Sequence, residues 1–194
     1  MSNSNKPEGA KLGWQVLETA YPFESAQYNL RNDRIQMEGN SETSYAYLER
    51  AGAVIVVPVT DDGKIILVRQ YRYPVDEWCW EVPAGGSHDT GDASLEEVVR
   101  KEMEEEIGAT CEKVEYIDFF YSANSMSDEK CHVFLALGVE LKHKPDTEET
   151  ESIEMHPLPA HEAMQLARSG QVKTGPCALA LFLCEDALRK HNYL

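Results

Sequence analysis

Polar and apolar residues alternate along much of residues 1–50, for example in Tyr45-Ala46-Tyr47-Leu48. A period of two is typical of strands that bury one face. Turn residues interrupt the alternation at Tyr21-Pro22 and at Glu38-Gly39-Asn40. The pattern therefore predicts a small antiparallel β-region, preceded by about ten polar residues without regular structure.

Residues 51–194 follow a different pattern, in which short apolar runs are separated by turn signals and by helical periodicity. The runs predict strands at residues 53–59, 64–71, 77–82, 114–121, 132–139 and 153–158. Asp61-Asp62-Gly63 should join the first two as a hairpin. Helices are expected at residues 95–107, 160–169 and 176–191. A mixed sheet flanked by helices, of the α+β class, accounts for this order in one domain.

The ends of the helix at residues 95–107 are marked by specific residues. Ser94 is a good N-cap, and Glu96 and Glu97 would place carboxylates at the positive end of the helix dipole. Gly108 follows the last apolar residue and suits the left-handed conformation that ends many helices.

The composition and net charge of the chain limit the kinds of ligand that it can bind. The chain has 194 residues, 42% hydrophobic and 27% charged, as in an ordinary globular protein. Its net charge of −16 would repel a phosphate backbone, which argues against DNA or RNA as a partner. A small anionic substrate is compatible with this charge only where cations or a divalent metal reverse the local field.

Signals for export and membrane insertion are missing from the sequence. The first nine residues are polar, and no apolar run approaches the roughly 18–20 residues that span a bilayer. The five cysteines form no Cys-x-x-Cys pair, and Cys177 and Cys184 lie in an apolar helical stretch that suits a core. An odd number of cysteines argues against a full disulfide framework, so we expect reduced thiols in a cytoplasmic protein.

Three glutamates give the strongest chemical signal. Glu102, Glu105 and Glu106 are three and four residues apart and should share one face of their helix. Carboxylate oxygens are the hard ligands that Mg²⁺ prefers, with Mn²⁺ as an alternative. Such a metal can neutralise phosphate oxygens and activate a bound water. The alternative is a solvated acidic face without a ligand.

Glu81-Val82-Pro83-Ala84-Gly85-Gly86 and Lys101-Glu102-Met103-Glu104-Glu105-Glu106-Ile107-Gly108 together resemble the Nudix box. In the second half, Lys101 stands where the family has Arg. The loop between the halves carries an insertion, which leaves Asp92 or Ala93 at the family's first acidic position. The resemblance implies an α/β/α sandwich with a mixed sheet over residues 51–194.

Val68-Arg69-Gln70-Tyr71-Arg72-Tyr73-Pro74 further resembles the ADP-ribose pyrophosphatase branch, which includes nucleotide-sugar pyrophosphatases. The resemblance implies that the Ala84 carbonyl joins Glu102, Glu105 and Glu106 as metal ligands, with Glu105 also assigned to catalysis. It places Arg72 at the substrate, the alternative being an exposed strand arginine.

In that branch the N-terminal β-region exchanges across a homodimer and contacts the base. Tyr28, Tyr45 and Arg50 match such contacts, and core packing is the alternative for them. The loop before Ser127-Asp128-Glu129 has Asn124-Ser125 where ADP-ribose enzymes have Pro-Gly.

The acidic loop at residues 147–151 resembles the loop that delivers the catalytic base, with Glu151 at the matching position and Glu149 as the alternative. The resemblance thus implies hydrolysis of a nucleoside diphosphate linked to a sugar, with ADP-ribose giving AMP and ribose 5-phosphate. The alternatives are a GDP-mannose or other nucleotide-sugar pyrophosphatase, and a Nudix-fold module that senses nucleotides without cutting them.

Overall fold

A computed structural model describes residues 6–86, 93–145 and 152–194. The chain divides into two compact units. The first consists of Met1–Ala51 together with Tyr121–Glu129, and the second of Gly52–Phe120 together with Lys130–Leu194. The alternating pattern of the first fifty residues gives no sign that a later segment, Tyr121–Glu129, belongs with them.

The first unit contains a short helix and an antiparallel sheet of three strands. Its elements are α1 Pro7–Lys11, β1 Gln15–Glu24, β2 Asn29–Gln36 and β3 Glu42–Glu49. The strands lie in the order β1-β2-β3. The small antiparallel β-region that the sequence predicts is therefore confirmed, as is its turn at Gly39 and Asn40, which have φ values of 83° and 64°.

Two local predictions for this unit are wrong. Tyr21-Pro22 does not turn the chain but lies inside β1. β1 is an edge strand, and its pairing with β2 shifts register between Ala20 and Phe23, which accommodates a proline without an N–H. The first ten residues also include most of α1, which starts with Pro7, where the missing N–H removes no helical hydrogen bond.

The centre of the first unit is partly ionic. Arg31 and Asp33, each 3% exposed, form an ion pair at 3.0 Å. In the described part of this unit, the buried apolar side chains are Ile35 and Tyr47. Several large apolar side chains remain exposed instead: Leu12, Trp14, Phe23, Tyr28 and Tyr45. The unit therefore buries little apolar surface within itself.

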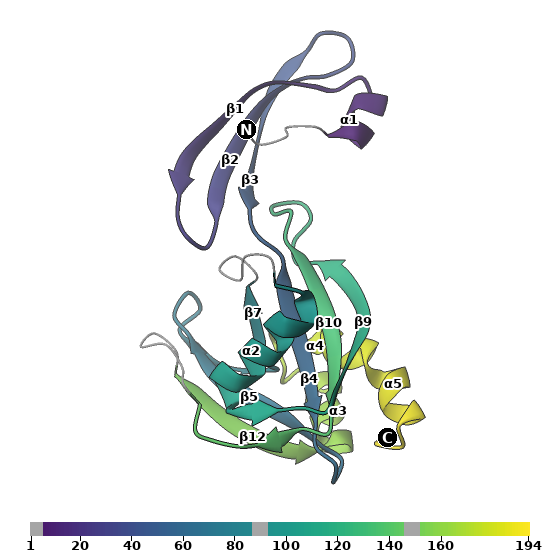
Figure 1. The fold of residues 1–194 in the computed structure, drawn as a ribbon. Coiled ribbons are helices and arrows are strands. Elements are labelled where there is room, and N and C mark those ends of the chain that lie inside the picture. The colour runs from purple at the N-terminus through teal and green to yellow at the C-terminus, as the bar shows by residue number, and fades with distance from the viewer. Residues whose placement is uncertain (1–5, 87–92, 146–151) are drawn as a thin grey trace. The chain divides into compact units, whose positions relative to one another are not determined.

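The second unit is built on a mixed sheet (Figure 1). The strands of the mixed sheet are β4 Ala53–Val59, β5 Lys64–Arg72, β6 Glu77–Glu81, β7 Ala84–Gly86, β9 Lys113–Tyr121, β10 Lys130–Leu137 and β12 Ile153–Pro159. Two further strands, β8 Ala109–Thr110 and β11 Glu140–Leu141, pair with each other in a separate antiparallel sheet. The main path runs β12-β5-β4-β10-β9, with β6 beside β5 and β7 beside β4. β10 is parallel to β4, whereas β12, β6 and β7 pair antiparallel.

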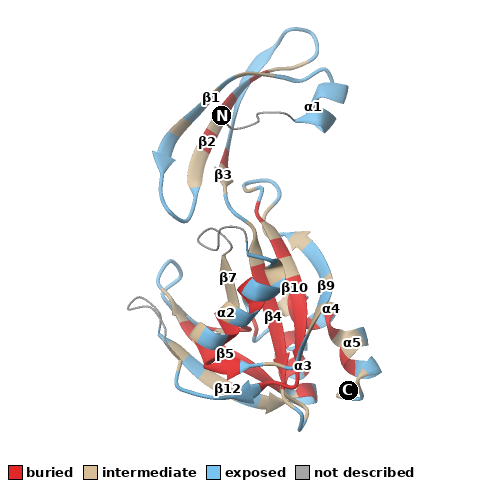
Figure 2. Ribbon diagram, viewed as in Figure 1, coloured by how far each residue is buried: buried red, intermediate tan, exposed pale blue. Residues whose placement is uncertain are grey.

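Helices cover both faces of this sheet. They are α2 Leu95–Ile107, α3 Ala160–Arg168, α4 Gly175–Leu183 and α5 Glu185–Lys190. α2 packs on one face through Val99 and Met103, and α3, α4 and α5 pack on the other (Figure 1). Buried residues concentrate along β4, β5 and β10 between these layers (Figure 2). The predicted α/β/α sandwich of the α+β class is confirmed.

The last predicted helix is interrupted. A single helix over residues 176–191 is wrong, because α4 ends at Leu183 and α5 begins at Glu185. Cys184 lies between them with a ψ of −9°, which departs from regular α-helical geometry. Cys184 and Cys177 are buried, as the sequence predicts. In the described parts of the chain, no helix combines the length and apolar character needed to cross a membrane.

Candidate active site

Helix α2 carries the glutamates and is held firmly at both ends. Ser94 and Glu97 form a reciprocal capping box at its start, and Gly108 adopts the left-handed conformation at its end. Glu102 and Glu106 belong to the buried face of the helix, at 9% and 5% exposure. Because both lie on a helix fixed at both ends, their carboxylates have defined positions against the sheet.

Both buried carboxylates lie against the segment Ala84–Gly86. The Ala84 N–H donates to Glu106 Oε2 at 3.2 Å. The Glu102 carboxylate occupies the space that a Cβ on Gly85 would need. Ala84–Gly86 forms the short strand β7, paired with β4, which the sequence pattern does not predict. Gly85 thus leaves room for a buried carboxylate directly on the backbone of a strand.

Glu105 has a different environment from its two neighbours. It is partly exposed and pairs with Lys101 at 3.7 Å, one turn earlier on α2. Within the described residues, no three His, Cys, Asp or Glu side chains gather closely enough to hold a metal ion. Mg²⁺ at phosphate sites is usually held by one or two carboxylates and completed by water and substrate phosphates. Glu102 and Glu106 fit that donor set by number and type.

Arg72, at the end of β5, forms a bidentate ion pair with Glu81, at the end of β6. Its Nε and Nη2 donate to the two Glu81 oxygens at 3.0 and 2.5 Å. These hydrogen bonds raise the pKa of the guanidinium against the opposing effect of burial, and the charges of Glu81 and Glu106 act in the same direction. Arg72 is therefore a fixed cation near the Glu106 carboxylate, with a side chain 41% exposed.

Glu81 is a residue whose role the sequence analysis missed. It is 2% exposed and also accepts a hydrogen bond from Thr174 Oγ1 at 3.0 Å. Thr174 stands at the N-cap of α4 but makes no capping bond there. The preceding Lys173 pairs with Glu77 at 3.0 Å. The start of α4 thus fixes both ends of β6, although 93 residues separate Glu81 from Thr174 in the sequence.

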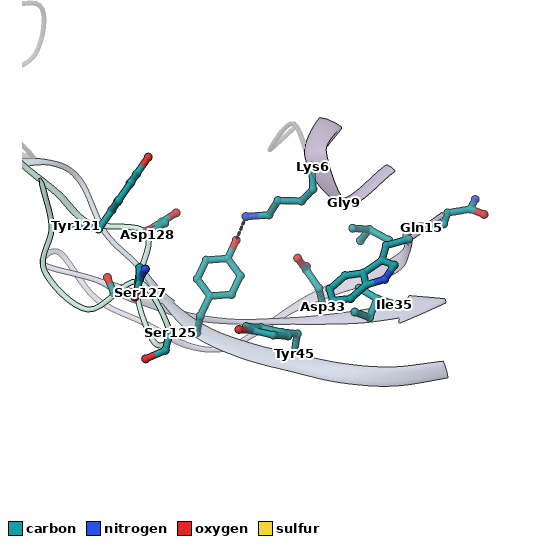
Figure 3. Close-up of a pocket in the computed structure, with 14 residues that line it drawn as sticks. Lys6, Gly9, Gln15, Asp33, Ile35, Tyr45, Tyr121, Ser125, Ser127 and Asp128 are labelled. Atoms are coloured by element: carbon teal, nitrogen blue, oxygen red, sulfur yellow. Dashed lines mark hydrogen bonds between the residues drawn. The ribbon is translucent and has the colours of Figure 1, made fainter. Parts of the chain in front are cut away.

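The first unit contains a cavity of about 490 Å³ that Tyr45 lines (Figure 3). Trp14 and Tyr121 contribute further rings to its wall, and Asp33 a carboxylate. The Lys6 ammonium donates to the Tyr47 hydroxyl at 3.0 Å, as Figure 3 shows. A cavity of this size with aromatic walls and a few charged groups suits a flat organic ring.

Tyr28 and Arg50 lie outside the lining of this cavity. Tyr28 is 40% exposed and its ring is 5.7 Å from that of Phe23. Arg50 pairs with Glu129 at 3.1 Å, and its backbone N–H donates to Asp128 Oδ1 at 3.0 Å. Arg50 therefore ties the end of β3 to the segment Ser127-Asp128-Glu129 within the first unit. Glu151 and Glu149 lie outside the described residues.

Comparisons with known proteins show which family and fold the chain resembles. A model of the NUDIX domain matches residues 49–174. The ADP-ribose pyrophosphatase of Bacillus subtilis is 33% identical over 82% of this chain and 85% of its own. That of Mycobacterium tuberculosis is 30% identical over 84% and 79%. The crystal structure of an ADP compounds hydrolase superimposes with a TM-score of 0.79 at 19% identity, covering 93% of this chain and 97% of that one.

Proposed function

Since the chain belongs to the Nudix family of hydrolases, we propose that it hydrolyses the diphosphate of a nucleoside diphosphate linked to a sugar, with ADP-ribose as the preferred substrate. The observation that carries the proposal is the pair of buried carboxylates of Glu102 and Glu106 on the Ala84–Gly85 backbone. The fixed guanidinium of Arg72 lies near the Glu106 carboxylate, whose negative charge helps to raise the pKa of Arg72. Two carboxylates that can bind a metal ion, with a guanidinium nearby for the phosphate oxygens, suit a metal-bound diphosphate.

We assign Glu102, Glu106 and the Ala84 carbonyl to Mg²⁺, with Mn²⁺ as the alternative, and Glu105 to the rim of the same site. A divalent ion bound there would supply charge for the phosphate oxygens and lower the pKa of a water. Arg72 would hold a phosphate oxygen through the donors that Glu81 leaves unused, since a guanidinium has five N–H groups. Water adds to one phosphorus, the P–O–P bond breaks, and ADP-ribose yields AMP and ribose 5-phosphate.

A comparison of substrates tests this function. Catalytic efficiency in Mg²⁺ should be higher for ADP-ribose than for GDP-mannose. It should be lowest for dGTP, because dGTP has no sugar linked to its terminal phosphate for the enzyme to bind. A preference for GDP-mannose would change only the assigned sugar nucleotide. A preference for dGTP would overturn the assignment to sugar-linked substrates. Tight binding of ADP-ribose with no hydrolysis of any of the three would favour the sensing module.

The catalytic base is proposed to be Glu151, from its place in the acidic loop. Glu151→Gln should lower kcat by about a hundredfold, at the low end of the range for general bases. It should change KM far less, because the carboxylate acts on the water in the transition state. Glu149→Gln is the matched control in the same loop. A large loss of kcat in that variant and none in Glu151→Gln would transfer the role to Glu149.

Arg72 provides a prediction on substrate binding. Arg72→Lys should raise KM about tenfold, because one ammonium cannot contact Glu81 and a phosphate with the geometry of a fork. Glu81→Gln should raise KM to a similar degree, since it loosens the guanidinium without removing it. The double variant should lose little more than either single one, as expected for residues acting through one another. Arg69→Lys, on the same strand but the opposite face, should leave KM unchanged.

We further propose that the protein is a homodimer and that Tyr45 of the first unit contacts the nucleobase of the substrate. The support is the apolar surface that this unit leaves exposed, including Trp14 and Phe23. A sheet that buries so little within itself gains most by pairing with a second copy, and two-fold dimers are the commonest such assembly. A monomer at micromolar concentration in light scattering would contradict this assembly.

A further inference from the structure

The first turn of helix α4 lies against β6, beside the ion pair of Arg72 and Glu81. Thr174, the N-cap of α4, donates through Oγ1 to Glu81 Oε1 at 3.0 Å. One turn into the helix, the Cys177 thiol donates to the Val82 carbonyl at 3.9 Å. Burial raises the pKa of this thiol to about 12, and the charges of Glu81 and Arg72 also act on that pKa. The start of α4 is therefore a neighbour of the candidate active site.

The Thr174 hydroxyl contacts this carboxylate and does not cap its own helix. A threonine at the N-cap usually accepts a hydrogen bond from the second or third N–H of the helix. The second residue of α4 is Pro176, which has no N–H, and Thr174 makes no capping bond with its side chain. Its hydroxyl instead reaches a strand that lies 93 residues earlier in the sequence. The hydroxyl thus contributes to the geometry of Glu81 and not to the start of the helix.

Three hydrogen bonds from two directions fix the Glu81 carboxylate. Oε1 accepts from Thr174 Oγ1 and from Arg72 Nε, each at 3.0 Å, and Oε2 accepts from Arg72 Nη2 at 2.5 Å. Glu81 is 2% exposed, so water cannot easily replace a lost donor. The two partners of an ion pair can shift together, whereas a bond from a separate helix fixes where the pair lies. Thr174 provides that bond.

We propose that Thr174 is a positioning residue that orients the Arg72 guanidinium toward the diphosphate of the substrate, acting through Glu81. The proposal rests on the function proposed above, in which Arg72 holds a phosphate oxygen. Glu81 accepts from Nε and Nη2, which leaves donors on Nη1 and Nη2 for the phosphate. Their direction depends on the plane of the guanidinium, and a bidentate pair ties that plane to the Glu81 carboxylate. Loss of the Thr174 bond would leave every charge in place and change only this direction.

Substitutions of Thr174 test the proposal by kinetics. Thr174→Val removes the hydroxyl and keeps the branched shape of the side chain. We expect KM for ADP-ribose to rise about fivefold with kcat almost unchanged, because a contact made in both the ground state and the transition state is weakened. Thr174→Ser keeps the hydroxyl and should keep the wild-type KM. In the Arg72→Lys background, Thr174→Val should change KM little further, since no fork remains to be oriented.

Thr60→Val is the matched control. Thr60 Oγ1 also donates to a carboxylate, Asp62 Oδ1 at 2.5 Å, but in the turn before β5, at the opposite end of that strand from Arg72. Both variants should lose a little stability toward denaturant, and only Thr174→Val should raise KM. A similar rise of KM in Thr60→Val would attribute the effect to general loosening of the fold and would overturn the proposal. Thr174→Ala provides the same test if Thr174→Val does not fold.

The Arg72 Nε–H proton gives a readout that does not depend on turnover. Its NMR signal is identified by its absence from Arg72→Lys. Its exchange with water should be about fivefold faster in Thr174→Val than in the wild type or Thr174→Ser, because the bond that fixes the ion pair is lost. Unchanged exchange in Thr174→Val would overturn the proposal.

The two readouts together separate this proposal from the proposed function. Faster exchange in Thr174→Val with an unchanged KM would overturn the positioning role if Arg72→Lys raises KM. If neither variant raises KM for any sugar-linked diphosphate, Arg72 does not hold the substrate. The function proposed for Arg72 then fails, while the orientation of its guanidinium by Thr174 stands.

Discussion

Glu102→Gln and Glu106→Gln are each expected to lower kcat by about a thousandfold, since the loss of a charged metal ligand removes several kcal/mol of transition-state stabilisation at 1.36 kcal/mol per tenfold. The fold should survive both changes. A glutamine at position 106 can still accept the Ala84 N–H that now donates at 3.2 Å. A glutamine at position 102 has the size of the side chain that already fits over Gly85. Charge is therefore the property that each variant removes.

Helix α2 offers a control for these variants. Glu104 lies on the same helix but is exposed, 3.7 Å from His143. Glu104→Gln removes the same charge from the same helix, away from Ala84 and Gly85, and should leave kcat unchanged. The measurement is kcat against Mg²⁺ concentration for all three variants, with unfolding by denaturant as the check on the fold. Rates close to the wild type in both buried variants would contradict the metal assignment.

The parts of the fold that local signals encode could be predicted from the sequence. Ser94 and Gly108 mark the two ends of α2 because capping and left-handed geometry depend on the few residues around them. Asp61-Asp62-Gly63 does the same for the β4–β5 hairpin, where Gly63 has a φ of 78°. The turn predicted at Tyr21-Pro22 is wrong because this signal is also local. A proline in an edge-strand bulge has the same local signature as a proline in a turn.

The arrangement of the site depends on contacts that no local pattern contains. Helical spacing places Glu102, Glu105 and Glu106 on one face, but only the position of β7 decides that two meet the backbone and one meets Lys101. The bond between Glu81 and Thr174 joins residues 93 positions apart. A signal was nonetheless present: a charged residue between apolar ones, as Glu81 is, needs a partner when its strand is buried.

Gly85→Ala is the variant that tests the arrangement of the site rather than its charges. A methyl group on Gly85 would overlap the Glu102 carboxylate, so one of the two must move. The Gly85 backbone is held by pairing with Val54, whereas the end of a glutamate side chain moves more easily. We therefore expect displacement of the carboxylate and a loss of kcat similar to that of Glu102→Gln, about a thousandfold, although every charged residue is still present.

Stability measurements separate this outcome from simple overpacking. If the carboxylate moves, Gly85→Ala should unfold at nearly the denaturant concentration of the wild type. If β7 moves instead, the variant should lose about 1–3 kcal/mol, as overpacked sites do, and Gly85→Ala with Glu102→Ala should regain that stability without regaining activity. Gly175→Ala is the control, because a Cβ there meets nothing within 4 Å. Full activity in Gly85→Ala would show that the position of Glu102 against the strand has no part in the reaction.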